Sequence, residues 1–126
     1  MNRRQFIGCV RSDRGTAAVE FAIVGPIFLM LIIGLIYTCM LLFTMGSMQF
    51  AVEEGARCAS VQTTVCTNNA TTISHALGAY YGPIAAPTFT SSLAACGHVV
   101  SSTTSFSFNM GLSSVNVPLT ATSCFP

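Results

Sequence analysis

The chain has 126 residues, of which 52% are hydrophobic and only 7% carry a formal charge. An average soluble domain is about 25% charged, so this composition argues against an ordinary soluble globule, and its hydrophobicity argues against a disordered chain. The formal net charge is +1 and every Asp, Glu and Arg precedes residue 58, which leaves no basic surface for nucleic acid, whose phosphates require one.

The first predicted element is an apolar helix. Residues 21–43 are uncharged and almost entirely apolar, and about 20 such residues suffice to cross the hydrocarbon core of a bilayer. A buried core helix is the alternative, but so small a protein has no core large enough to enclose it. We therefore expect a transmembrane and stalk helix over residues 16–57, within a helical run that could extend from Ala17 to about Val61, with the lipid bilayer as its first partner.

Most of the positively charged residues precede this helix. Four arginines precede it, whereas Arg57 stands alone beyond it, beside Glu53 and Glu54. Because Arg and Lys favour the cytoplasmic side of a membrane span, we expect the N-terminus in the cytoplasm and residues 58–126 outside. Residues 1–15 then form a short basic cytoplasmic leader. Its arginines are Arg3, Arg4, Arg11 and Arg14.

One face of the helix beyond the apolar run carries mostly small apolar side chains at helical spacing. Such a face suits a stalk that packs against its own head domain. Its residues are Met48, Ala51, Val52, Gly55, Ala56 and Ala59.

The Ser/Thr-rich remainder, residues 58–126, predicts a small head of α+β class. Asn69 is expected to cap a short helix over residues 70–81. Alternating patterns over residues 105–111 and 115–121 predict an antiparallel β-hairpin or small sheet with a turn at residues 111–114, and Pro118 suits an edge strand.

Four cysteines in the head, on the expected oxidising side, predict a disulfide framework that a domain this small needs. They are Cys58, Cys66, Cys96 and Cys124. Their three possible pairings remain open, and we favour Cys66–Cys96 with Cys58–Cys124, because the second bridge would tie the last strand to the stalk. Two cysteines with His75 and His98 match no usual zinc spacing, so we expect no metal and no cofactor.

The head contains few of the residue types that catalyse reactions in enzymes. Residues 58–126 contain no Asp, Glu or Lys, which limits acid–base catalysis to His or Tyr, and no Asp is present to orient a His beside a nucleophilic Ser. We expect that the protein is not an enzyme.

The most specific motif is Gly15, four small or apolar residues, then Glu20 and Phe21 at the start of the apolar helix. A carboxylate at a membrane edge is costly; the alternative to a functional role is that the helix dipole favours it there. With the basic leader and Gly55-Ala56-Arg57, the motif resembles the TadE-like minor pilins and pseudopilins of the Tad (Flp) pilus system. Residues 117–122 resemble the last strand of that family.

This resemblance implies a role and partners. Prepilin peptidase would cut between Gly15 and Thr16, and Glu20 and Phe21 would direct assembly, with Glu20 pairing the new α-ammonium. The partners would be other pilin and minor-pilin subunits and the inner-membrane assembly platform. The chain would serve pilus biogenesis, secretion and adhesion as a single-pass bacterial inner-membrane protein with a periplasmic head, or within a surface pilus. The alternative is an envelope protein whose disulfide-stabilised head binds a partner without entering a fibre.

Overall fold

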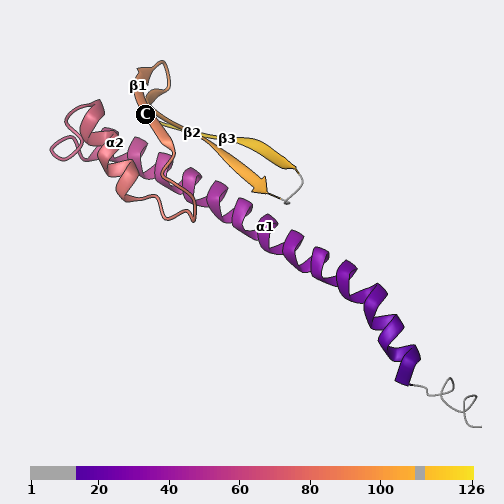
Figure 1. The fold of residues 1–126 in the computed structure, drawn as a ribbon. Helices are drawn as coiled ribbons and strands as arrows, with labels where there is room; N and C mark the ends of the chain where they lie inside the picture. The colour runs from indigo at the N-terminus through magenta and orange to yellow at the C-terminus, as the bar shows by residue number, and fades with distance from the viewer. Residues whose placement is uncertain (1–13, 110–112) are drawn as a thin grey trace, which may run out of the picture. The chain divides into compact units, whose positions relative to one another are not determined.

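The computed structural model describes residues 14–109 and 113–126 and divides the chain into two compact units, one ending at Ile36 and the other comprising Tyr37–Pro126. Most of the expected leader lies outside the described residues. The elements in chain order (Figure 1) are α1 (Arg14–Val61), α2 (Asn69–Gly78), β1 (Thr88–Ala94), β2 (Gly97–Asn109) and β3 (Ser114–Phe125). The expected α+β class, with a long N-terminal helix and a disulfide-bonded head, is confirmed.

Helix α1 is continuous through Pro26 and ends at Val61, where the sequence pattern placed its end. It is the one helix in the described part of the chain that is long and apolar enough to cross a membrane. Only 6% of its most apolar window is buried, which disfavours the alternative of a soluble protein's core helix. The helix therefore fits a single-pass membrane protein.

Helix α2 begins with a capping box. The Oδ1 atom of Asn68 accepts a hydrogen bond from the Thr71 N–H at 2.9 Å, and the Thr71 hydroxyl oxygen accepts one from the Asn68 N–H at 3.1 Å. These two bonds satisfy donors that a helix start otherwise leaves free. The expected cap at Asn69 is thus wrong by one residue, and the helix ends at Gly78 rather than Tyr81.

The strands form a three-stranded antiparallel sheet in the order β1-β2-β3. The expected hairpin corresponds to β2 and β3, whose register places Phe106 opposite Val117. Pro118 lies on an edge strand, as expected, because β3 has a neighbour on one side only. The sequence patterns missed β1 and the first half of β2. Residues 111 and 112 of the expected turn lie outside the described residues.

A two-residue turn, Ala95-Cys96, joins β1 to β2, because Ala94 pairs with Gly97. Gly97 has a φ of +121°, a conformation that residues with a Cβ rarely adopt. A Cβ atom at this position would also collide with the Phe125 carbonyl oxygen. Glycine is therefore required where the turn approaches the end of β3.

The core of the second unit lies between the last third of α1, α2 and one face of the sheet (Figure 1). The six small or apolar residues expected on the packing face of α1 are all buried, Met48 and Val52 at 1% and 0% exposure. Across from them lie Ala76 of α2 and, from the sheet, Phe89, Val100, Phe106, Leu119 and Ala121. The spacing of small residues on α1 thus predicted the main packing surface of the head.

Aromatic and polar contacts add to this core. The Tyr37 and Phe108 rings lie 5.6 Å apart, and the Tyr81 N–H donates to the Ser47 Oγ at 2.7 Å. The Tyr80 hydroxyl donates to the Ile84 carbonyl oxygen at 3.4 Å, and burial raises the pKa of Tyr80. The part of α1 from Tyr37 to Val61 and the head therefore belong to one packed unit.

Candidate assembly segment and cystine centre

Glu20 is the only charged residue between Gly15 and Val52. Its side chain is exposed on α1, and its neighbours Val19 and Phe21 are 61% and 77% exposed. The carboxylate is thus surrounded by apolar side chains that face outward. In a membrane or among packed helices, such a carboxylate requires a positively charged or hydrogen-bonding partner.

The apolar side chains of the first unit are exposed on all sides of the helix. Exposed apolar area on this scale marks a membrane or protein contact surface in a stable protein. The large apolar residues concerned are Val19, Phe21, Ile23, Val24, Ile27, Phe28, Leu29, Met30, Leu31, Ile33, Leu35 and Ile36.

Gly15 and Thr16 lie in the first turn of α1. Amides in the first turn lack carbonyl partners within the helix, so the backbone there opens more readily than in later turns. A Cβ atom on Gly15 would have no neighbour within 4 Å. Among the described residues, no packing contact therefore explains a glycine at this position.

The four head cysteines form two disulfides, Cys58–Cys66 and Cys96–Cys124, so the pairing that we favoured is wrong. The chain reverses directly after α1, with the Cys66 N–H donating to the Gln62 carbonyl oxygen at 2.9 Å. This turn brings the Cα atoms of Cys58 and Cys66 to 5.8 Å, a separation suited to a disulfide.

The second disulfide joins the β1–β2 turn to β3, where Cys124 lies opposite Val99. We expected a disulfide to tie β3 to the stalk, but a hydrogen bond makes this link. The Ser60 hydroxyl, near the end of α1, donates to the Phe125 carbonyl oxygen at 3.1 Å.

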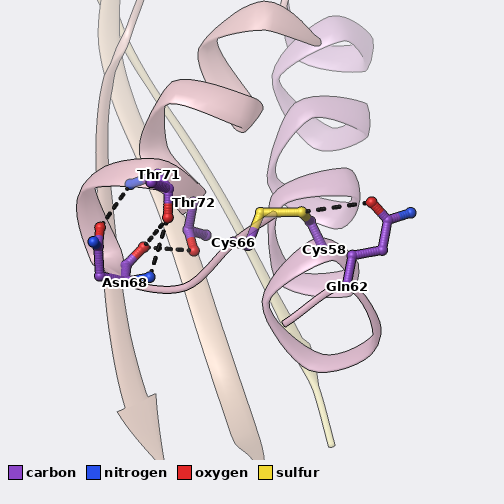
Figure 2. Close-up of a disulfide and its surroundings, with 6 residues drawn as sticks. All are labelled: Cys58, Gln62, Cys66, Asn68, Thr71 and Thr72. Carbon is purple, nitrogen blue, oxygen red and sulfur yellow. Dashed lines mark hydrogen bonds between the residues drawn. A yellow bond between two sulfur atoms is a disulfide. The ribbon is translucent and has the colours of Figure 1, made fainter. Parts of the chain in front are cut away.

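The Cys58–Cys66 disulfide lies between the end of α1 and the start of α2, next to the capping box of Asn68 (Figure 2). Gln62 Oε1 lies 3.9 Å from Cys58 Sγ. A disulfide sulfur has no proton to donate, so we treat this approach as a contact and not as a hydrogen bond. Both cysteines are buried, at 1% and 6% exposure.

His75 of α2 completes this centre. One of its ring nitrogens and the two sulfurs all lie within 4.8 Å of one another. Its Nδ1 atom is buried and has no hydrogen-bond partner in the described part of the chain. Sequence spacing missed this grouping because the three residues come from a helix end, a turn and a second helix. His98, the other candidate, lies in β2 opposite Leu93 and Phe125.

The described residues combine a long apolar helix that has one carboxylate near its start with a disulfide-bonded α+β head, which fits a single-pass membrane protein. Residues 15–57, about a third of the chain, match a family model described as TadE-like protein, so this segment is similar to that family. The match begins at Gly15 and ends at Arg57, which confirms the resemblance at those motifs, and it does not extend to residues 117–122. No curated protein and no solved structure matches the chain.

Proposed function

We propose that the chain is a minor pilin or pseudopilin, a membrane-anchored structural subunit in the biogenesis of a Tad (Flp) pilus and in the adhesion that such a pilus mediates. The observation that carries the proposal is the TadE-like match at residues 15–57. This segment includes Gly15, Glu20 and the exposed apolar helix, which are the parts a pilin uses to insert and assemble.

The apolar surface of α1 would contact first lipid and then other subunits. Before assembly it lies in the lipid bilayer, with the arginines of the leader on the cytoplasmic side and the head in the periplasm. During assembly, helices of other pilin and minor-pilin subunits replace the lipid. The assembly platform in the inner membrane would guide this exchange.

Processing after Gly15 would give Glu20 its partner. Cleavage by prepilin peptidase makes Thr16 the N-terminus, and its α-ammonium lies within about one helical turn of Glu20 in the same chain or beside Glu20 of a neighbour. Charges that enter a low dielectric must be paired. Each subunit would therefore enter the assembly in the register that brings an ammonium to a carboxylate, while Phe21 packs beside it.

The substitution Glu20→Ala tests the proposal. We expect normal membrane insertion but a fall of at least about tenfold in the amount of subunit recovered with sheared fibres. The substitution leaves the α-ammonium of Thr16 without its partner, and an unpaired buried charge costs about 3–5 kcal/mol. Glu53→Ala removes the same residue type from an exposed position in the second unit and should leave recovery unchanged. The intact mass of the recovered chain, compared between cells with and without active peptidase, tests cleavage between Gly15 and Thr16.

Equal recovery of the Glu20→Ala and wild-type chains would reject the assembly role. That result would favour the alternative, a single-pass envelope protein whose head binds a partner outside any fibre. A full-length N-terminus in cells with active peptidase would reject processing alone, and the pairing of Glu20 with Thr16 would fall with it.

A further inference from the structure

The Cys58–Cys66 disulfide and His75 form the one group of potential metal ligands that the described residues bring together. Two thiolates and one imidazole are a ligand set that zinc and similar thiophilic cations prefer, with water completing a tetrahedron. We propose that the reduced head binds such a cation through Cys58 Sγ, Cys66 Sγ and His75, and that the cation is released when the disulfide forms. This inference is independent of pilus assembly.

The distances suit a metal ion after a small adjustment. Zinc–sulfur and zinc–nitrogen bonds of about 2.3 and 2.0 Å place sulfur and nitrogen ligands roughly 3.6 Å apart in a tetrahedron. All three ligand atoms already lie within 4.8 Å of one another. The His75 ring therefore has to move by on the order of 1 Å, while the two sulfurs separate by rotation about their Cα–Cβ bonds once they are no longer bonded.

The unpartnered nitrogen of His75 supplies an independent argument. A buried polar atom without a hydrogen bond destabilises a fold, and Nδ1 of His75 is such an atom among the described residues. A neutral imidazole nitrogen can offer its lone pair to a cation, and one of the two ring nitrogens of His75 lies within 4.8 Å of both sulfurs. His75 also lines a shallow depression together with Glu54 and Tyr81, from which water could reach the fourth coordination position.

The chemistry balances with a dithiol as the reductant. The dithiol transfers two electrons and two protons to the Cys58–Cys66 disulfide, yielding two protein thiols, and is itself oxidised to a disulfide. A divalent cation then displaces the two thiol protons, which are released to solvent. A newly synthesised chain, which carries thiols, would reach the metal-binding state without any reductant, and the cation would hold α1 to α2 until oxidation.

Cobalt(II) provides a direct test, because thiolate ligation gives it an intense charge-transfer absorption. The full-length chain is prepared in detergent with the other four cysteines, Cys9, Cys39, Cys96 and Cys124, replaced by Ser. It is then titrated with cobalt under nitrogen, oxidised or reduced with a phosphine. We expect about one cobalt per reduced chain with the thiolate band, and none per oxidised chain.

Histidine variants in the same background decide whether the geometry matters. His75→Ala should raise the dissociation constant at least about tenfold, and His75→Gln, which keeps more of the side-chain volume, should do the same. His98→Ala is the matched control and should leave the affinity unchanged. Absence of cobalt binding by the reduced background chain overturns the proposal. Equal affinities of the background and both His75 variants also overturn it, because any flexible dithiol would give that result.

Discussion

Gly55 of α1 lies close to both α2 and β2. A Cβ atom at this position would lie 3.0 Å from the Ala76 Cβ and 3.5 Å from the Val100 Cγ1. Ala56, the next residue in the Gly-Ala-Arg motif, is fully buried, whereas Arg57 is exposed. The motif that ends the TadE-like segment is therefore explained in this chain by packing, with two small residues facing the head and an arginine facing solvent.

Replacing Gly55 with Leu should destabilise the head by about 1–3 kcal/mol, because the larger side chain has no space between α2 and β2. The free energy of unfolding can be measured in urea by circular dichroism on the chain in detergent. Gly46→Leu is the control, since a Cβ at Gly46 has no neighbour within 4 Å and leucine favours a helix. Equal effects of the two substitutions would contradict this account of Gly55.

Some residues of the candidate sites could be identified from the sequence and others could not. Gly15 and Glu20 stand in a local motif, so their spacing was enough to single them out. His75 was recognisable only as one of two histidines, because its position beside a disulfide depends on the turn after α1 and on the start of α2. A ligand set assembled from separate elements leaves no regular spacing in the chain.

Helix α2 depends on one asparagine of an adjacent pair. Asn68→Ala removes the side-chain acceptor of the Thr71 N–H and should destabilise the head by about 1 kcal/mol. Asn69→Ala changes a residue already inside the helix and should have little effect or raise stability slightly, because alanine is the better helix former. Thermal unfolding of the two variants compares them directly. A larger loss in Asn69→Ala would show that the cap is misassigned.

The elements with a regular apolar period were the predictable ones. The packing face of α1 repeats small apolar residues at helical spacing, and the paired halves of β2 and β3 alternate around Phe106 and Leu119. In β1 only Phe89 is well buried, while Leu93 is 75% exposed, so no alternating pattern marks the strand. The disulfide pairing was undetermined for a similar reason, since it depends on a chain reversal that cysteine spacing does not specify.

The two compact units divide within α1, after Ile36. The buried core of the head includes four residues of α1, from Met48 to Ala56, with Tyr37 and Leu41 packed at its margin. The three-part division expected from sequence, with a head beginning at residue 58, remains a prediction. This prediction requires that residues 58–126 fold without the part of α1 that contributes to the core.

Two fragments answer this question. Residues 37–126 contain every element of the core and should unfold cooperatively when both disulfides are formed. Residues 58–126 lack Met48, Ala51, Val52 and Ala56 and should show no cooperative transition, because the sheet loses the surface against which it is buried. Circular dichroism during heating measures both fragments. Cooperative unfolding of the shorter fragment would instead support a head that begins at residue 58.

The two disulfides also determine how the head would respond to mechanical tension. A force applied between α1 and the end of β3 would pass through Cys58–Cys66 and Cys96–Cys124, so the chain enclosed by each pair carries no load. The cysteines of the larger loop are 28 residues apart in the sequence. At about 3.5 Å per extended residue, the disulfide prevents an extension on the order of 100 Å. Within the head, only the chain outside the two loops, which includes all of α2 and β1, could lengthen before a covalent bond breaks.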